Sequence, residues 1–397
     1  MVILDMAATT FSRILVFATL VFVGHAAQRT KPDGPIVRTQ YGDVRGMYVE
    51  EGAIFLGLPF GVPPVGELRW KPPRAYNTSW APKVRDGTVP GPACRQIGCG
   101  PNITDYHHDC NRDKARTQSE DCLYLNVFVP RSVLNSTAVR LPVLCWFHGG
   151  DYHAGTGAAM VYDGRILANK TNTVIVTTNY RLGVFGYLVT GEGEDDARGN
   201  YGTLDQIEVL KWVQQNIADF GGDKDKVTIF GQSAGSDSVA VLLTSDRAAH
   251  LFHQGIMLSV PFSITHKTQL EAIRLGNDFT KLANCSAGDM KCLRSKPADD
   301  ILHAQYELSF TPDEQVIADT MAYHYGNFAH TGDPNKPSQY VYTTGDVLKS
   351  PLNWPKYNEE NQFPNMNFTT PQNVIVHDYN KEKCDFWDKE NIYSGID

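Results

Sequence analysis

The sequence predicts an α/β fold in which a mostly parallel central sheet is flanked by helices. Strand-like apolar runs alternate along the chain with amphipathic helical segments, and long crossovers separate the strands. The composition is globular, because 42% of the 397 residues are hydrophobic and 20% are charged. It excludes collagen-like, coiled-coil and largely disordered chains, and the length leaves ample room for a buried core.

Four apolar segments predict strands of this sheet. Residues 141–147 (LPVLCWF) form an apolar run that ends in His-Gly-Gly, and residues 173–179 (TVIVTTN) are rich in β-branched side chains. Shorter runs follow at 226–230 (KVTIF) and 255–260 (GIMLSV). Such short, nearly unbroken apolar runs are typical of strands that are buried in a parallel sheet.

Two segments between the strands predict helices. Apolar residues recur at three- and four-residue spacing over 204–220, which places them on one helix face, and the glycines at 221–222 end the pattern. Residues 234–243 predict a second helix. By contrast, the first 110 or so residues are rich in Pro and Gly, as at 57–64, and predict loops and short strands.

Residues 1–26 are typical of a secretory signal peptide. A positive charge at Arg13 precedes an apolar run over 14–23, and small residues at 24 and 26 mark a cleavage site. The run is too short to span a bilayer comfortably, and no other stretch is long and apolar enough to do so. We therefore expect a secreted, extracellular protein without a transmembrane segment.

Secretion predicts glycosylated asparagines, and six Asn-x-Ser/Thr sequons follow the signal. The candidate acceptors are Asn77, Asn102, Asn135, Asn169, Asn284 and Asn367. The formal net charge is 36 − 44 = −8. Because a nucleic-acid binder needs a basic face, we expect no nucleic-acid partner. Neither a metal nor a cofactor is expected.

Ser233 is the candidate nucleophile. It lies in the sequence Gly-Gln-Ser-Ala-Gly at 231–235, a Gly-x-Ser-x-Gly pattern that chance alone gives in roughly one chain in ten of this size. Here the pattern stands between a predicted strand and a predicted helix, which is the context of a nucleophile elbow. The alternative interpretation is a Gly-rich turn whose serine caps the helix.

A second motif, His-Gly-Gly-Asp-Tyr at 148–152, directly follows the strand predicted at 141–147. A glycine run at this place can aim backbone N–H groups at a developing oxyanion, and the N–H of Ala234 would add another donor. The alternative is a tight turn that requires positive φ angles, and both interpretations can hold together.

Several longer motifs occur in a specific order and spacing: LGLPFGVPPVGELRWKPP (56–73), SEDCLYLNVFVP (119–130), WFHGGDYHAGTG (146–157), NYRLGVFGYL (179–188) and the segment 199–235. In these motifs the sequence resembles the type B carboxylesterase family, which includes cholinesterases and the non-catalytic neuroligin-like adhesion proteins. The resemblance runs from about residue 35 to 305 and resumes at about 306. It implies an α/β-hydrolase fold and a carboxylic ester hydrolase that forms an acyl-enzyme from a small-molecule ester. It further implies Ser233 as nucleophile and Gly150, Asp151 and Ala234 as oxyanion donors.

The resemblance also assigns four of the eight cysteines. The implied disulfides are Cys94–Cys122 and Cys285–Cys292. Cys99 and Cys110 could pair with each other, which the family pattern does not include. Cys145 lies in a predicted strand and is expected to be a buried free thiol. Cys384 matches the last disulfide cysteine of the family, but its partner is not found here.

The catalytic acid and histidine of the family are missing from the sequence. The family takes them from an Asp-Glu-Gly and a His-Gly-x-Glu segment, and neither segment occurs. The simplest interpretation is that a long internal segment is absent at Gln305/Tyr306, as in a skipped exon or a faulty gene model. The sequence then comprises a signal peptide (1–26), the N-terminal part of the hydrolase domain (27–305) and a C-terminal remnant (306–397).

Without that segment, Ser233 has no recognised base and the sheet lacks the strands that would carry the acid and the histidine. Four histidines outside these motifs are better explained as structural or exposed side chains than as a catalytic base: His303, His324, His330 and His377. We therefore expect an ester hydrolase with impaired activity and an exposed sheet edge. The alternatives are a secreted, non-catalytic binding protein of the neuroligin-like kind and a truncated product that folds poorly.

Overall fold

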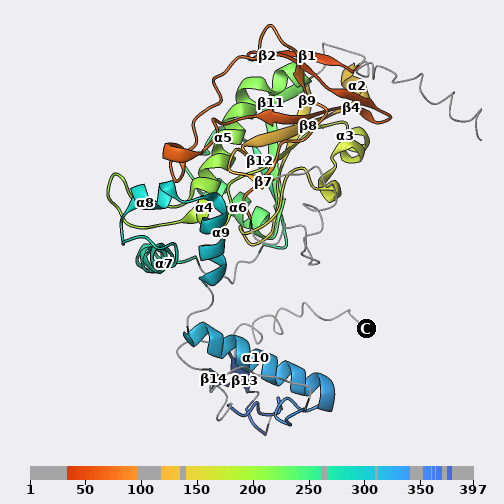
Figure 1. Ribbon diagram of the computed structural model, residues 1–397. Coiled ribbons are helices and arrows are strands. Elements are labelled where there is room, and N and C mark those ends of the chain that lie inside the picture. The colour runs from red at the N-terminus through yellow and green to blue at the C-terminus, as the bar shows by residue number, and fades with distance from the viewer. Residues whose placement is uncertain are drawn as a thin grey trace, which may run out of the picture. The chain divides into compact units, whose positions relative to one another are not determined.

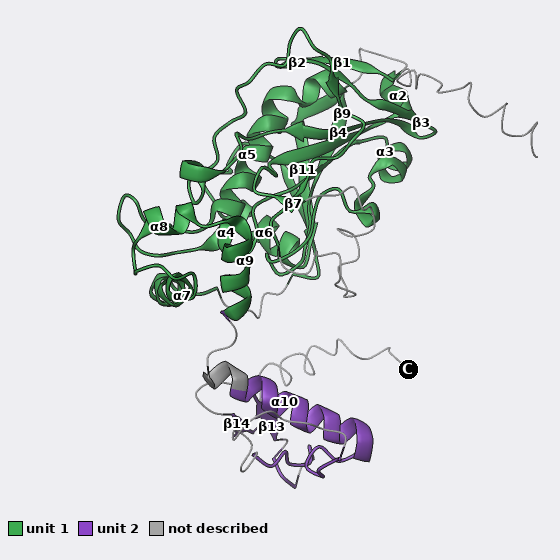
Figure 2. Cartoon of the chain, in the orientation of Figure 1, with its two compact units in different colours: residues 1–307 green, residues 308–397 purple. Residues whose placement is uncertain are grey.

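The computed structural model describes the chain in two compact units, residues 1–307 and 308–397 (Figure 2). The described residues are 34–96, 118–134, 140–260, 266–308, 312–339, 352–358, 360–362, 364–368 and 373–377. The predicted signal peptide lies outside them.

The first unit is built around a seven-stranded sheet with the order β12-β11-β9-β10-β8-β4-β3 (Figure 1). The strands are β3 (Met47–Val49), β4 (Gly52–Pro59), β8 (Tyr124–Pro130), β9 (Leu141–Phe147), β10 (Val174–Thr178), β11 (Gly222–Gln232) and β12 (Gln254–Leu258). The four strands from β12 to β10 are parallel to one another, whereas β8, β4 and β3 continue the sheet with antiparallel pairs. The parallel part is the one that carries Ser233.

The central strands of the sheet, such as β8 and β10, are buried on both faces, which explains their unbroken apolar runs. Successive residues of a strand point to opposite faces. On β10, Val176 packs into the large core cluster and Ile175 packs into a separate small cluster, together with Phe128 of β8 and Ala168. Both faces are therefore covered, as the sequence predicts for this part of the chain.

Helices and short 3₁₀ turns connect the strands of this unit. The helices are α2 (Arg131–Leu134), α3 (Arg165–Thr171), α4 (Gly183–Tyr187), α5 (Tyr201–Asn216), α6 (Ala234–Leu243), α7 (Gln269–Leu282), α8 (Met290–Ser295) and α9 (Ala298–Glu307), and the 3₁₀ turns are η1 (Gly66–Leu68), η3 (Met160–Tyr162) and η4 (Ile217–Phe220). Helix α3 packs on β4, β8 and β10, and α6 packs on β9, β11 and β12. The helix predicted at 204–220 is α5 with η4, and Gly221 ends it with a φ of 80°.

Two smaller sheets precede and flank the central one. Strands β1 (Ile36–Thr39), β2 (Gly42–Arg45) and β5 (Arg85–Asp86) form a three-stranded sheet, and β6 (Ala93–Cys94) pairs with β7 (Gln118–Ser119). The described N-terminal region thus has the short strands and loops that its Pro and Gly content predicts.

The second unit contains helix α10 (Pro312–Thr331) and a hairpin of β13 (Asn365–Asn367) and β14 (Val374–Val376). Aromatic rings hold its described parts together, because Trp354 contacts the rings of His324, Tyr325 and Phe368. The His324 imidazole is buried, and its Nδ1 donates to the carbonyl of Pro334 at 2.9 Å.

The predicted junction at Gln305/Tyr306 lies inside helix α9, which continues without interruption to Glu307. Gln305 is buried, and its Oε1 accepts a hydrogen bond from the backbone N–H of Val184 at 2.8 Å. Tyr306, the next residue, is 67% exposed. The first unit is therefore packed and hydrogen-bonded as far as Gln305. The boundary between the two units follows two residues after the Gln305/Tyr306 junction.

Both disulfides implied by the family resemblance are present: Cys94–Cys122 and Cys285–Cys292. Cys145 is a buried free thiol, as predicted, and burial raises the pKa of that thiol to about 12. The other three cysteines, Cys99, Cys110 and Cys384, lie outside the described residues.

Four of the six sequon asparagines lie in described segments, and all four are exposed: Asn77, Asn169, Asn284 and Asn367. Asn102 and Asn135 lie outside these segments. Among the described residues, no helix has both the length and the apolar character needed to cross a bilayer.

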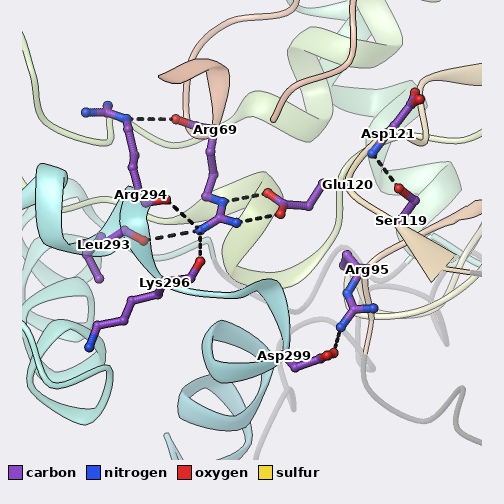
Figure 3. Close-up of polar contacts among 9 residues, drawn as sticks. All are labelled: Arg69, Arg95, Ser119, Glu120, Asp121, Leu293, Arg294, Lys296 and Asp299. Atoms are coloured by element: carbon purple, nitrogen blue, oxygen red, sulfur yellow. Dashed lines mark hydrogen bonds and ion pairs between the residues drawn. The ribbon is translucent and has the colours of Figure 1, made fainter. Parts of the chain in front are cut away.

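A buried arginine fastens α8 to the rest of the unit (Figure 3). The Arg69 guanidinium donates two hydrogen bonds to the Glu120 carboxylate, each 2.6 Å long. Its third nitrogen, Nη1, donates to the carbonyls of Leu293, Arg294 and Lys296. These carbonyls lie at the end of a helix, where few intrahelical donors remain, and the arginine supplies a charged donor to them.

Strand β12 lies at one end of the sheet order and has the exposed edge that the sequence predicts. Each of its five residues is exposed, and Ile256, Met257 and Leu258 are 46%, 39% and 44% exposed. Apolar side chains on both faces of an edge strand favour pairing with another copy of the chain.

We therefore expect Ile256→Lys to lower self-association of the protein several-fold, because a charge on an edge strand opposes strand pairing. Sedimentation velocity measures the aggregated fraction. The matched control is Ile166→Lys, since Ile166 is 57% exposed but lies on helix α3. An equal effect of the two substitutions would show that added charge, and not the β12 edge, is responsible.

Candidate active site

Ser233 occupies a sharp turn between β11 and α6. Its φ and ψ angles are 55° and −126°, a conformation that L-residues rarely adopt outside strained functional turns. Two glycines allow this turn. A Cβ atom on Gly235 would lie 2.1 Å from the carbonyl oxygen of Phe147, and one on Gly231 would lie 2.3 Å from that of Gly235. The turn therefore has the strand–serine–helix geometry of a nucleophile elbow.

The backbone of Ser233 is held on both sides, whereas its hydroxyl is free. Its N–H donates to the carbonyl of Leu258 on β12 at 3.0 Å, and its carbonyl accepts from the N–H of Asp237 at 2.9 Å. In the described part of the chain, the hydroxyl makes no hydrogen bond, and the residue is only partly buried. A serine that merely capped α6 would use its side chain to do so, and no such bond is present.

The loop that begins at His148 approaches Ser233 closely. A Cβ atom on Gly149 would lie 3.2 Å from the Cβ of Ser233. Gly150 and Asp151 have φ angles of 116° and 53°, so the tight turn with positive φ is present. The carbonyl of Gly150 accepts from the N–H of Ala154 at 3.0 Å, which closes the turn.

Three backbone N–H groups around Ser233 are without acceptors in the described residues. Those of Gly150 and Asp151 donate to no group there, and that of Ala234 has no intrahelical acceptor because Ala234 is the first residue of α6. These are the three donors that the sequence predicts for an oxyanion. The Asp151 residue is exposed, and its backbone N–H remains available whatever its side chain does.

The buried side chain of His148 stabilises the loop that begins at this residue. Its ring is fully buried and stacks on Tyr180 at 4.4 Å between ring centres. Nδ1 donates to the carbonyl of Gly149 at 2.9 Å, and the Tyr180 hydroxyl donates to the His148 carbonyl at 2.6 Å. Burial lowers the pKa of this imidazole to about 4, so His148 is neutral at pH 7.

The buried imidazole predicts a loss of stability in acid. As the pH falls from 6.5 towards 4, the unfolded chain binds a proton at His148 that the folded chain does not, so this contribution exists above pH 6.5 and is lost below it. Between pH 7 and pH 5 the free energy of unfolding should fall by about 2 kcal/mol from this group alone. His148→Gln should remove that part of the pH dependence, which urea unfolding at both pH values measures. Identical pH dependence in the two proteins would contradict this account.

An acid and a histidine that the sequence analysis missed lie near the elbow. Asp237 stands in the first turn of α6, and its Oδ2 accepts a hydrogen bond from the Tyr152 hydroxyl at 2.8 Å. The Nε2 of His266 lies 3.5 Å from the same oxygen. Their signals in the sequence were weak, because the two residues are 29 positions apart and belong to no common motif.

The histidines that the sequence analysis considered have ordinary environments in their own units. His303 is an exposed residue of α9 in the first unit. In the second unit, His324 is buried in the aromatic cluster, His330 lies in the last turn of α10, and the exposed His377 donates from Nδ1 to the carbonyl of Asn361.

The protein has an α/β-hydrolase fold. Two features define this class: the mixed sheet, and the strained serine that lies between a strand and a helix. Residues 33–313 match the carboxylesterase family, and the chain belongs to that family.

The chain is 39% identical to carboxylesterase 1D of Rattus norvegicus, in an alignment that covers 69% of this chain and 49% of the relative. It is also 39% identical to neuroligin-2 of Homo sapiens, over 72% of this chain and 38% of the relative. The crystal structure of carboxylesterase EST55 of Geobacillus stearothermophilus at pH 6.2 aligns with a TM-score of 0.61 and 37% identity, over 69% of this chain and 53% of that one. The chain thus spans about half the length of the relatives it matches.

Proposed function

We propose that this chain is a serine carboxylic ester hydrolase that acts on small-molecule esters, with Ser233 as its nucleophile. The observation that carries the proposal is the Ser233 hydroxyl at a strained elbow, which makes no hydrogen bond to any described residue and lies beside three backbone N–H groups that likewise have no acceptor among those residues. Membership of the carboxylesterase family supports the same reaction class.

In this reaction the Ser233 oxygen attacks the ester carbonyl carbon, and the N–H groups of Gly150, Asp151 and Ala234 stabilise the negative oxygen that forms. Donors that are fixed before the reaction are worth several kcal/mol in the transition state, because they need no reorganisation. The alcohol leaves, and water then attacks the acyl-enzyme and releases the acid.

Turnover by this chain is expected to be slow compared with a hydrolase that has a complete triad. The Asp-Glu-Gly and His-Gly-x-Glu segments that supply the acid and the histidine in the family are not found in the sequence. An oxyanion hole and a bound substrate still give residual catalysis of roughly 10³ to 10⁴ over water.

Hydrolysis of p-nitrophenyl acetate by the full chain tests the proposal. The wild-type protein should release p-nitrophenolate faster than its Ser233→Ala variant, which keeps the fold and removes the nucleophile. Equal rates for the two proteins would show that Ser233 does no chemistry.

A second proposal is a non-catalytic binding protein, and the 39% identity to neuroligin-2 of Homo sapiens is the observation that favours it. It predicts a soluble, monodisperse protein whose Ser233 is unreactive. The hydrolase is the better supported of the two, because a serine at an elbow with free oxyanion donors has no evident use in binding alone.

We also propose that the protein is a secreted glycoprotein. Two disulfides, four exposed sequon asparagines and the signal-like residues 1–26 support this location. Expression in a secreting cell line should yield medium-borne protein whose mass falls on treatment with an endoglycosidase. Retention inside the cell without a mass shift would contradict it.

A further inference from the structure

The acid Asp237 is fixed one helical turn after the nucleophile. Its backbone N–H donates to the carbonyl of Ser233 at 2.9 Å, and its side chain is only 14% exposed. The Tyr152 hydroxyl donates to its Oδ2 at 2.8 Å. Burial raises the pKa of Tyr152 above its usual value, so the phenol keeps its proton and remains a donor to the carboxylate. Asp237 is therefore a positioned acceptor beside the elbow.

His266 lies beside Asp237, on the segment that follows β12. It follows β12 by eight residues, and the last residue of that strand, Leu258, accepts the hydrogen bond from the Ser233 N–H. Its Nε2 faces the Asp237 carboxylate at 3.5 Å. In the part of the chain that the structure describes, its Nδ1 makes no hydrogen bond, and the side chain is 69% exposed. One ring nitrogen is thus engaged by an acid and the other is free.

These three residues have the chain order of a serine triad, and Asp237 contacts both of the others: its backbone N–H donates to the Ser233 carbonyl, and its carboxylate faces His266. In an α/β-hydrolase the order is serine, acid, histidine, and here it is Ser233, Asp237, His266. Asp237 lies one helical turn after Ser233, and a turn of an α-helix rises about 5.4 Å along the helix axis. The contact of 3.5 Å is long, as such contacts often are before substrate binds.

We propose that His266, oriented by Asp237, is the general base for Ser233 in this chain. The inference rests on the proposed ester hydrolysis. In it, His266 takes the role of the histidine that the family supplies from the missing segment. The Ser233 hydroxyl proton passes to the free nitrogen of His266 as the Oγ–carbon bond forms and the carbonyl electron pair moves to oxygen. When the intermediate collapses, the carbon–oxygen bond to the alcohol breaks, and His266 returns the proton to the leaving alkoxide. In the second half-reaction the same nitrogen takes a proton from water as its oxygen attacks the acyl carbon; the bond from that carbon to Oγ then breaks, and His266 returns the proton to Ser233.

The test uses His266→Gly in the full chain, with p-nitrophenyl acetate as substrate and imidazole added as a replacement base. We expect the variant to lose about 100-fold in rate, because a positioned general base contributes at least that much. Added imidazole should restore a large part of the rate. His250→Gly is the matched control, because His250 is an exposed histidine four residues before the opposite end of β12. It should keep the wild-type rate and gain nothing from imidazole.

The positioning role of Asp237 is tested with Asp237→Asn, which keeps an acceptor for Tyr152 and removes the negative charge. This variant should lose about tenfold in kcat with little change in KM. A His266→Gly protein with the wild-type rate, or with a lost rate that imidazole does not restore, would overturn the inference while leaving Ser233 as nucleophile. A wild-type rate no higher than that of Ser233→Ala would instead overturn the proposed function itself.

Discussion

Replacing Gly235 by alanine is expected to lower the reactivity of Ser233 on the order of 100-fold without removing the serine. A Cβ atom at this position would lie 2.1 Å from the carbonyl oxygen of Phe147 and 2.8 Å from that of His148. Both atoms are backbone and cannot turn away, so either β9 or the first turn of α6 must move. A displacement of about 1 Å at an active site can cost on the order of 100-fold in rate. We expect a loss of that size in p-nitrophenyl acetate hydrolysis and a fall in stability of about 1–3 kcal/mol from overpacking.

The control for this substitution is Gly193→Ala. There the added Cβ would meet the carboxylate end of Asp196 at 2.9 Å, which can rotate aside. This variant should keep the wild-type rate and stability. If Gly235→Ala also kept the wild-type rate, the close packing of the elbow would not be needed for its chemistry.

The second large effect is expected at the buried ion pair of Arg181 and Asp205. The Arg181 Nε and Nη2 atoms donate to the two oxygens of Asp205 at 2.8 and 2.7 Å, and the side chains are only 4% and 0% exposed. Burial raises the pKa of Asp205 and the arginine opposes that rise, so much of the attraction offsets desolvation. Asp205→Asn would leave the guanidinium charge buried and unpaired, which typically destabilises by about 3–5 kcal/mol.

Urea unfolding measures this effect, and the exposed pair of Lys224 and Asp225 provides the control. That pair is 53% and 72% exposed, and Asp225→Asn should cost less than about 1 kcal/mol. A similar, small cost at both positions would show that water or a neighbouring group compensates the buried charge of Arg181.

The parallel half of the sheet could be predicted from the sequence because its strands are short apolar runs. The strand at 141–147 and the helix at 234–243 have the predicted bounds, and β10 differs from prediction by one residue at each end. The strand at 226–230 extends instead over Gly222–Gln232, because Gly222 pairs with Leu141 of β9 across an irregular register and Gln232 pairs with Leu258 of β12. The ends of this strand are set by backbone pairing with its neighbours, which the polarity of its side chains does not predict.

The antiparallel half was not predicted from periodicity. Strand β4 (Gly52–Pro59) is buried along nearly its whole length, so it shows no alternation of polar and apolar residues, and the sequence predicts only loops and short strands for this region without bounds. It is a strand because it pairs with β8 across an irregular register near Phe55 and Leu58. Such long-range pairing has no local signal.

In the candidate site, too, some residues could be predicted from the sequence and others could not. Ser233 and the three backbone N–H groups proposed as oxyanion donors belong to contiguous motifs and could be predicted from the sequence. The pairing of Asp237 with His266 could not, because it depends on where β12 returns the chain beside α6. Asp237 in particular has the appearance of an ordinary acidic residue in the first turn of a helix.

The central claim is that Ser233 is a chemically competent nucleophile, and a fluorophosphonate probe tests it most directly. After incubation of the full chain with the probe, peptide mass spectrometry should place a single stoichiometric adduct on Ser233, and the Ser233→Ala protein should carry none. A folded, monodisperse wild-type protein that stays unlabelled at Ser233, or that is labelled equally after the substitution, would contradict the account.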